Sequence, residues 1–339
     1  MPRRVANVLL GAGVVGLAAT GLAGWLLPFG QALPLFDLHR ALGVAALLLV
    51  AAWKWRIARR SLRRRLERPP VDRSDRDRTI WGGLTAAVLL VGAFGLGLAW
   101  TLGLLSYESL LGYSPLNLHV YLGLALLPAL VPHLLHRWEG WPRRVEVRGR
   151  RTALRALGLT VGALALWRGL EALAASPARR TTGSKHAGSF SGNDYPVTIW
   201  TFDRVPAIDR DGWRLKVVGK VERPGEIGYD ELVGSFPARE RAIVLDCTGG
   251  WWSEQLWRGV GLRDVLVSRR PLAGARGVEV TSVTGHSWSF RIEELAEALL
   301  ATQVGGEELT AGHGYPVRLA FPGRRGFQWV KWVERIEVY

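Results

Sequence analysis

The sequence of 339 residues has one cysteine, Cys247, and comparatively few acidic residues. A lone cysteine excludes an internal disulfide, and the lack of spare thiols suits an oxidising compartment without fixing it. Only 29 Asp and Glu accompany 44 Lys and Arg. Such an excess is typical of nucleic-acid-binding proteins, but here the arginines cluster between apolar stretches, where they act as membrane topology signals. We therefore expect no nucleic-acid partner.

The first half of the chain is dominated by long apolar stretches. Five of them are long enough, or nearly so, to span a bilayer of about 30 Å, and they predict an all-α transmembrane bundle over residues 1–175. The first is too long for a cleaved signal peptide, and further spans follow it directly. The predicted spans are Val5–Leu27, Leu35–Trp53, Ile80–Leu105, Leu118–Leu135 and Ala153–Ala174.

The loops between these stretches differ sharply in charge. Loop 54–78 carries one lysine and ten arginines, and loop 137–151 carries six arginines. Loops 28–34 and 106–117 carry neither residue type. The positive-inside rule therefore puts the N-terminus and the basic loops in the cytoplasm. Five spans then place the residues after Ser176 outside, so we expect a multi-pass cell-membrane protein with an extracytoplasmic C-terminal domain.

A short motif recurs at the start of the second and fourth predicted spans. Asp37-Leu-His-Arg-Ala-Leu-Gly43 opens one, and Asn117-Leu-His-Val-Tyr-Leu-Gly123 opens the other. His39 and His119 then lie at similar depth, about one turn inside helices that enter from the outer face. Two facing imidazoles are what a six-coordinate haem iron needs in a helical bundle. The alternative is a pair of interfacial histidines satisfied by water or headgroups. The paired motif is similar to small b-type cytochromes, which implies one haem b held by both histidines.

Two further histidines lie near the inner end of the fourth span. His133 follows His119 by 14 residues, about 21 Å along the same helix face, which is similar to the spacing in two-haem cytochromes. The position 14 residues after His39 is Trp53, however, which is not a usual haem ligand. We therefore interpret His133 and His136 as interfacial and expect a single outer haem.

The surroundings of Cys247 form the most informative stretch of the second half. The apolar run Ala242–Leu245 predicts a buried strand that ends beside Cys247, and Gly249 and Gly250 predict a sharp turn. One interpretation is a buried thiol that acts as a small hydrophobic group. The other is a thiolate that binds a metal whose remaining ligands come from a cofactor.

Two long motifs mark the second half of the chain. The first is Cys247-Thr-Gly-Gly-Trp251, followed by Trp257-Arg-Gly-Val-Gly-Leu-Arg-Asp-Val-Leu266. The second is His313-Gly-Tyr-Pro-Val-Arg-Leu-Ala-Phe-Pro-Gly323, with Gly326 and Val330-Lys-Trp332. They are similar to the molybdenum-binding segment and to the second signature of the sulfite oxidase family of molybdopterin enzymes. The resemblance covers Asp194 to Tyr339. It implies an α+β, β-rich domain over residues 193–339, in which Cys247 binds the molybdenum of a molybdenum-molybdopterin cofactor.

The same resemblance implies further cofactor-binding residues. Arg318 can bind phosphate oxygens in a bidentate manner, and Lys331 adds a point charge. His313 can donate to the pterin or the phosphate, Gly326 permits close backbone approach, and Ser282 is a further pterin contact. Each basic residue alone would be interpreted as a solvated surface charge, but their spacing within the motifs favours cofactor binding.

The chain departs from sulfite oxidases directly after the cysteine. Those enzymes carry an arginine-rich segment there, whereas Trp251 and Trp252 predict an apolar, aromatic mouth here. Sulfite is therefore disfavoured as the substrate, and a small or sulfoxide-type molecule is expected. Four arginines remain as candidates to approach the metal: Arg258, Arg291, Arg324 and Arg325.

The composition also divides the second half into a tether and a domain. Residues 176–192 are rich in Ser, Thr, Gly and Ala, which predicts a flexible tether. Beyond it, short β-rich runs alternate with Gly and Pro. Strands are predicted over 213–219, 277–283 and 317–321, and helices over 229–234 and 292–302.

These features favour a membrane-anchored molybdopterin oxidoreductase that exchanges electrons with the quinone pool or another carrier through its haem. Its expected partners are a small-molecule substrate, a redox carrier and membrane lipid. One alternative is a b-type electron-transfer module whose C-terminal domain is a cofactor-free docking domain. Another is a non-redox membrane scaffold with coincidental histidines.

Overall fold

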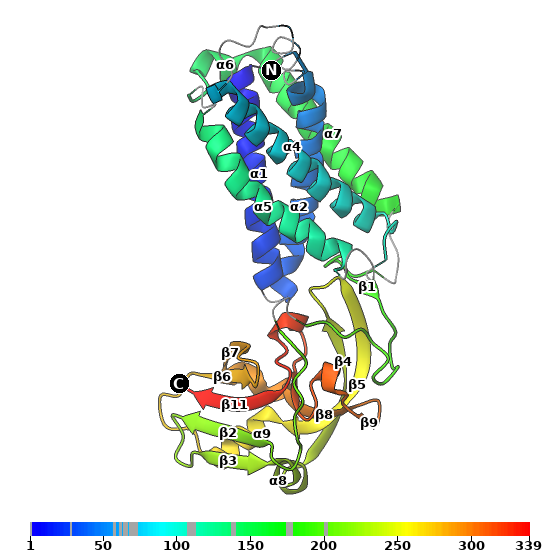
Figure 1. Ribbon diagram of the computed structural model, residues 1–339, viewed down its shortest axis with the longest axis vertical. Coiled ribbons are helices and arrows are strands. Elements are labelled where there is room, and N and C mark those ends of the chain that lie inside the picture. The colour runs from blue at the N-terminus through cyan, green and yellow to red at the C-terminus, as the bar shows by residue number, and fades with distance from the viewer. Residues whose placement is uncertain are drawn as a thin grey trace. The chain divides into compact units, whose positions relative to one another are not determined.

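In the computed structural model, the chain forms two compact units, residues 1–183 and 184–339 (Figure 1). The first is helical and the second is rich in β-strands, as predicted. The second unit begins at Ser184, inside the segment that was expected to be a tether. The structure describes residues 2–27, 29–56, 59–60, 63, 67, 74–106, 113–136, 140–173, 179–199 and 203–339.

Among its described residues, the helical unit contains five helices that are long and apolar enough to cross a membrane. Their apolar side chains are widely exposed: Val15, Val88 and Leu173 are 62%, 63% and 82% exposed. Surfaces of this kind are compatible with a membrane protein, because lipid tails can cover them. The five helices are α1 (Arg3–Leu26), α2 (Phe29–Leu49), α4 (Ser74–Thr101), α5 (Pro115–His136) and α7 (Arg150–Leu173). A π-helical turn, η1 (Val50–Lys54), follows α2, and the short α6 spans Arg144–Arg148.

Glycines let the helices pack closely in two antiparallel pairs. On α1, the missing Cβ atoms of Gly16, Gly21 and Gly24 leave room for Leu42, His39 and Phe36 of α2. On α4, Gly92 and Gly97 leave room in the same way for Leu122 and His119 of α5. Small residues at helix interfaces are typical of membrane proteins, because they allow close van der Waals packing. The internal repeat seen in the sequence thus corresponds to two helix pairs, each with a glycine beside its histidine.

The C-terminal unit contains two β-sheets. In the first, the described strands run in the order β1-β5-β8-β10, with β4 added beside β5 and β9 beside β8. In the second the order is β3-β2-β11-β6-β7, so that the last strand of the chain lies between β2 and β6 (Figure 1). The strands of the first sheet are β1 (Lys185–His186), β4 (Ala238–Asp246), β5 (Trp251–Gly261), β8 (Leu299–Val304), β9 (Glu307–Glu308) and β10 (Arg318–Ala320). Those of the second are β2 (Arg214–Gly219), β3 (Gly225–Gly228), β6 (Gly277–Ser282), β7 (Ser287–Arg291) and β11 (Val333–Val338).

Short helices connect these strands. The predicted strands near 213–219, 277–283 and 317–321 correspond to β2, β6 and β10. The predicted helix over 229–234 is confirmed as α8, whereas the one over 292–302 is wrong in its second half, which forms β8. The helices are α8 (Tyr229–Ser235), α9 (Leu262–Arg269), and the 3₁₀ turns η3 (Ile292–Glu297), η4 (Ala311–His313) and η5 (Gly326–Gln328).

The segment 176–192, expected to be a flexible tether, is hydrogen-bonded over its second part. Residues 176–178 lie outside the described residues. From Lys185 onward, β1 pairs in parallel with the start of β5, and the amide of Phe190 donates to the carbonyl of Glu254 at 2.7 Å. On this edge β8 covers only the later part of β5, from Trp257 on. The earlier residues of β5 therefore leave backbone groups that residues 185–190 satisfy.

Candidate functional site

Cys247 directly follows β4, which is paired along its whole length with β5. The strand predicted before the cysteine is therefore confirmed, but its burial alternates: Ile243 and Leu245 are buried, whereas Ala242 is exposed and Val244 is half-buried. In the following turn, the amide N–H of Gly249 lies 3.3 Å from Cys247 Sγ, and Gly250 has φ of +99°, which favours glycine. A Cβ added at Gly326 would lie 3.0 Å from Cys247 Cα. The close approach at Gly326 is thus to the backbone that carries the thiol.

A buried ion pair holds the end of β4. Asp246 Oδ1 accepts hydrogen bonds from Arg325 Nη1 at 3.0 Å and from Ser184 Oγ at 2.7 Å. Loss of one partner of a buried pair typically costs about 3–5 kcal/mol. Arg325 is one of the four arginines that were candidates to approach the metal, and it lies beside the cysteine. The other three lie elsewhere: Arg258 is exposed, Arg291 pairs with Glu293, and Arg324 pairs with Glu294.

The environment of Cys247 opposes ionisation of its thiol. Burial raises the pKa of Cys247, while the amide of Gly249, the hydroxyl of Thr198 and the cations of Arg325 and Lys331 act against this. A bound metal cation deprotonates a coordinating thiol outright. The buried thiol therefore stays protonated unless a metal binds, and a metal converts it into a ligand.

Arg318 is a buried cation that has no acidic partner among the described residues. Its guanidinium lies between the rings of Trp257 and Trp329, with Cζ 5.0 and 5.4 Å from their centroids. Nη1 donates to Tyr195 Oη at 3.1 Å and to the carbonyl of His313 at 2.9 Å. Nε is buried and has no hydrogen-bond partner in the described part of the chain. Since a buried charge is costly without a counter-charge, this position requires an anion.

Lys331 is a second cation close to the first, and it is half-buried. Gly314 has φ of +109°, and a Cβ added there would lie 2.9 Å from Arg318 Cβ and 3.2 Å from Lys331 Cβ. Lys331 Nζ donates to the carbonyls of Thr198 and Gly312 at 2.9 and 2.6 Å. Burial, assisted by the charge of Arg318, lowers the pKa of Lys331 to about 7. Two neighbouring cations without acidic partners fit the phosphate group of a molybdopterin cofactor.

His313 lies beside these cations and is held in its neutral form. Burial, with the charge of Arg318, lowers the pKa of His313 to about 4. The carbonyl of Tyr195 lies 2.9 Å from Nε2, so this nitrogen carries the proton, and Nδ1 accepts from Thr310 Oγ1 at 2.7 Å. Both ring nitrogens are thus bonded to protein groups. A direct contact between His313 and a cofactor stays a prediction.

A segment that the sequence motifs did not single out runs across the site. Tyr195 contacts Arg318 through its hydroxyl and His313 through its carbonyl, and its ring centroid lies 4.0 Å from that of His313. Thr198 is bonded to Lys331 through its carbonyl and accepts from Trp251 Nε1 at 2.9 Å. Residues 195–198 therefore bring the two signatures together. Their only local signal was a Tyr-Pro step at the start of the domain.

Two further predictions need adjustment. Trp251 is only 3% exposed and forms a wall of the site instead of its mouth, while Trp252 packs against His186 with ring centroids 4.9 Å apart. Ser282 is buried at the end of β6 and lies 3.1 Å from Thr284 Oγ1, oxygen to oxygen. Ser282 and Thr284 connect to Lys331 through Asp203. Asp203 accepts a hydrogen bond from the Thr284 hydroxyl, and its negative charge acts on Lys331.

Comparisons with known proteins identify the type of domain that contains this site. Residues 202–339 match the family described as oxidoreductase molybdopterin binding domain. The C-terminal half is a molybdopterin-binding oxidoreductase domain. Nitrate reductase [NADH] of Spinacia oleracea is 30% identical over 168 residues, covering 40% of this chain and 18% of that protein. Nitrate reductase [NADH] 1 of Oryza sativa subsp. japonica is 32% identical over 170 residues, covering 40% and 18%. The sulfane dehydrogenase SoxCD from Paracoccus pantotrophus matches with a TM-score of 0.38 and 26% identity, over 40% of each chain.

The molybdopterin-binding domain supports a molybdenum-molybdopterin cofactor, as predicted. The chain spans less than a fifth of the length of these nitrate reductases. The comparisons therefore establish the type of domain and do not single out the sulfite oxidase family that the motifs resemble.

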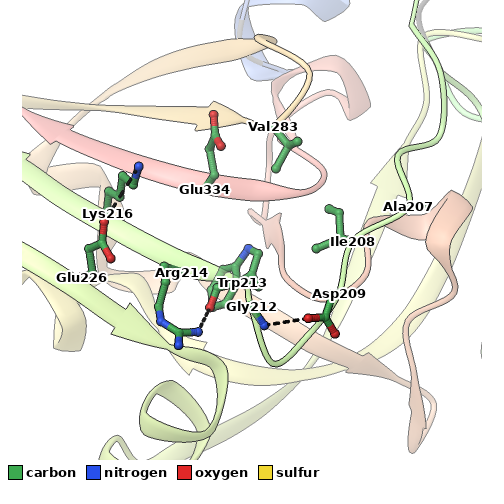
Figure 2. Close-up of a pocket in the computed structure, with 10 residues that line it drawn as sticks. All are labelled: Ala207, Ile208, Asp209, Gly212, Trp213, Arg214, Lys216, Glu226, Val283 and Glu334. Atoms are coloured by element: carbon green, nitrogen blue, oxygen red, sulfur yellow. Dashed lines mark hydrogen bonds and ion pairs between the residues drawn. The ribbon is translucent and has the colours of Figure 1, made fainter.

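An open hollow of about 550 Å³ lies in the same domain (Figure 2). Trp213 lies in its wall, and Lys216 and Glu226 approach each other at 3.8 Å. The described residues that line it include none of the predicted cofactor-binding residues. The hollow carries charges of both signs and is separate from the electropositive cluster around Arg318.

A second candidate site lies in the helical unit, where His39 and His119 are neighbours. Their ring centroids are 5.9 Å apart, with an angle of 85° between the ring planes. His39 Nδ1 lies 3.0 Å from the carbonyl of Leu17, and His119 Nδ1 lies 2.7 Å from the carbonyl of Ala93. Because a carbonyl only accepts, each Nδ1 carries the proton and each Nε2 keeps a free lone pair, as in metal-binding histidines. Two imidazoles bound to one metal ion at about 2 Å have ring centroids roughly 6 Å apart. The pair therefore fits two axial ligands of one haem.

The inner end of the helical unit gives less information. The side chains of His133 and His136 lie outside the described part of the structure. Trp53 lies in the π-helical turn η1, and the guanidinium of Arg155 stands 5.8 Å from its ring centroid. The position 14 residues after His39 is thus filled by an indole that packs against a cation. The expectation of a single haem stays a prediction.

Proposed function

We propose that this protein is a membrane-anchored molybdopterin oxidoreductase with an extracytoplasmic catalytic domain. A haem b held by His39 and His119 passes electrons between this domain and the quinone pool or another redox carrier. The observation that carries the catalytic part is the combination of one buried thiol, Cys247, with two neighbouring cations, buried Arg318 and half-buried Lys331, that form no ion pair with an acidic side chain among the described residues.

Three residues have distinct roles in this proposal. Cys247 binds the metal, Arg318 binds and orients the cofactor phosphate, and Lys331 adds positive charge next to it. When bound, molybdenum-molybdopterin supplies two-electron oxygen-atom transfer, while the protein supplies binding, orientation and exclusion of water. His313 and Ser282 stay candidate pterin contacts. The curated relatives are named nitrate reductases. Removal of one oxygen from a small molecule is therefore the reaction class that we propose, and a sulfoxide-type substrate falls in the same class.

The haem proposal is supported by the histidine geometry. Both Nδ1 atoms donate to carbonyls on the partner helix of their own pair, and this orients the two rings. Loops without Lys or Arg precede both histidine-bearing helices, so the haem would lie on the side where we place the catalytic domain.

Metal and haem analysis of the purified protein tests this function. We expect about one molybdenum and one haem per chain, with a low-spin b-type spectrum after reduction. Cys247→Ser should lose turnover and the Mo–S contribution in the X-ray absorption spectrum. A wild-type spectrum without a protein-derived Mo–S contribution would refute the assignment of Cys247.

Histidine variants separate this proposal from the alternatives. His39→Ala and His119→Ala should each lose the low-spin spectrum and quinone-linked turnover while keeping turnover with a dye that exchanges electrons directly with molybdenum. Haem without molybdenum in the wild-type protein would favour the electron-transfer module with a cofactor-free docking domain. The absence of both would favour the scaffold.

A further inference from the structure

The last turn of the helical unit, residues 179–183, is hydrogen-bonded to both helix pairs that carry the histidines. On the α2 side, Arg40, the residue after His39, donates to the carbonyl of Thr181. On the α4 side, Trp100 Nε1 donates to the carbonyl of Gly183 at 2.8 Å. Trp100 is 2% exposed and follows, by one helical turn, Gly97, which packs against the His119 ring. The last residue of the helical unit is thus hydrogen-bonded to the helix that supports His119.

A network of ion pairs holds the same turn. Glu171 of α7 pairs with Arg179 at 2.8 Å and with Arg40 at 3.5 Å. Arg179 also donates to the carbonyl of Thr101, the residue after Trp100. Gly183 has φ of +88°, a conformation that favours glycine and that aims its carbonyl at the indole. Several independent contacts therefore fix the position of the Gly183 carbonyl.

The next residue is bonded directly to the cysteine segment. Ser184 is fully buried, and its Oγ lies 2.7 Å from Asp246 Oδ1 and 3.4 Å from the carbonyl of Cys247. Asp246 precedes Cys247 in the chain. One peptide bond, between Gly183 and Ser184, thus joins a residue bonded to Trp100 with a residue bonded to the Cys247 backbone.

We propose that Trp100, Gly183 and Ser184 form the electron route between the histidine pair and the molybdopterin site. Electrons tunnel through covalent bonds and short hydrogen bonds much faster than through gaps. The route starts at the His119–Gly97 contact, continues through Trp100 and the Gly183–Ser184 peptide, and ends at Asp246 and Cys247. Each transfer along the route moves one electron and no proton. The site that gives the electron is oxidised by one electron, and the site that receives it is reduced by one electron. A two-electron reaction at molybdenum needs two such transfers, with the quinone or other carrier closing the balance.

This inference rests on the proposed function, and its test uses the full-length, cofactor-loaded protein. Trp100→Phe keeps an aromatic ring and removes the N–H donor to Gly183. The matched control is Trp81→Phe, because Trp81 lies on the same helix and is 65% exposed. Rapid mixing with a reductant or oxidant that reacts at molybdenum measures how fast the haem spectrum responds. We expect a response about tenfold slower in Trp100→Phe, because loss of the hydrogen bond weakens the electronic coupling along the route. Trp81→Phe should match the wild type.

Three further readouts distinguish an electron route from a merely structural contact. Trp100→Phe should keep its haem spectrum, molybdenum content and dye-linked turnover. Faster hydrogen exchange in the peptide around Gly183 should confirm that the hydrogen bond is lost. Ser184→Ala should slow the haem response as well, whereas Ser268→Ala, which removes a local bond to Val265, should not.

The two proposals fail in different ways. A haem response in loaded Trp100→Phe as fast as in the wild type would overturn the route and leave the proposed function intact. Wild-type protein without haem or molybdenum would overturn the proposed function and the route together. A slower response accompanied by loss of the haem spectrum would also overturn the route, because Trp100 would then act on haem binding.

Discussion

In the C-terminal unit, loss of contact with water disfavours the charged forms of three side chains. Arg318 stays charged between two indoles, the pKa of Lys331 falls to about 7, and the pKa of His313 falls to about 4. Burial of such groups opposes folding unless a ligand or a local partner compensates. For Arg318 and Lys331 we propose an anion as the compensating ligand, whereas His313 is satisfied by two protein partners. This difference leads to two predictions about single residues.

The first prediction concerns retention of the cofactor. Arg318→Gln should lower the affinity for molybdopterin by roughly 10- to 150-fold, because a charge-assisted hydrogen bond contributes about 1.5–3 kcal/mol. Pterin and molybdenum content per purified chain is the measurement. Arg269→Gln is the control, since Arg269 lies at the end of α9, outside both motifs. Equal cofactor content in the two variants would mean that Arg318 does not bind the phosphate.

The second prediction concerns acid stability. His313 has a folded-state pKa of about 4, below the unfolded value of about 6.5. Between these values the unfolded state binds more protons, so stability falls as the pH drops from about 6.5 to about 4, by at most about 3 kcal/mol. In cofactor-free protein, the unfolding temperature of His313→Gln should therefore fall less over this range than that of the wild type. His186→Gln, a change at an exposed histidine, should fall as much as the wild type. Parallel curves for wild type and His313→Gln would contradict the prediction.

Four of the residues that sequence reasoning identified in the C-terminal domain, Cys247, His313, Arg318 and Lys331, lie within the two motifs, whereas Ser282 lies outside them. Cys247, Arg318 and Lys331 were recognisable because a thiol and two cations recur there in a specific spacing. Tyr195 and Thr198 escaped because they lie far from both motifs in sequence and reach the site only through folding. Trp251 was placed wrongly at the mouth, because a pair of aromatic residues does not reveal that its indole N–H is satisfied inside by Thr198.

At the scale of elements, the histidine-bearing helices depend on the glycines that face them. A Cβ at Gly97 would lie 3.1 Å from Cε1 and from Nδ1 of His119, so the imidazole would have to shift. Gly97→Val should therefore reduce haem content or change the low-spin spectrum. Gly95→Val is a matched control on the same helix, because a Cβ there meets no atom within 4 Å. Equal haem content and spectra in both variants would contradict the haem assignment at His119.

Local sequence patterns predicted some secondary-structure elements correctly and others wrongly. Strand β4 was predictable, because an apolar run before a glycine turn has few alternatives. The second half of the helix predicted over 292–302 instead forms the start of β8, which is buried on both faces between β5 and β10. A short apolar run of this kind does not distinguish strand from helix by periodicity. The segment after residue 183 was predicted as a tether from its composition, but backbone bonds to β5 order it.

At the scale of the whole molecule, the distribution of arginine fixes the proposed topology. Five apolar helices place the two ends of the chain on opposite sides of a membrane, provided that all five cross it. From the basic loop 54–78 and the loops that lack Lys and Arg, we propose that the N-terminus lies inside and the molybdopterin-binding domain outside. In this proposal the turn from Arg179 to Gly183 belongs to the outer face, together with His39 and His119.

Reporter fusions test this arrangement. A reporter that is active only in the cytoplasm should be active after Arg65 and inactive after Tyr339, and a reporter that is active only outside should show the reverse. The expectation follows from the charge difference, because the ten arginines of loop 54–78 resist translocation, whereas the loops without Lys or Arg cross readily. Replacing several arginines of that loop with glutamine should weaken the asymmetry and give mixed signals. The same compartment for both fusions in the wild-type sequence would exclude five crossings. If both signals are cytoplasmic, the C-terminal domain with Cys247 lies on the cytoplasmic side, and electrons from the histidine pair would have to leave toward the opposite face.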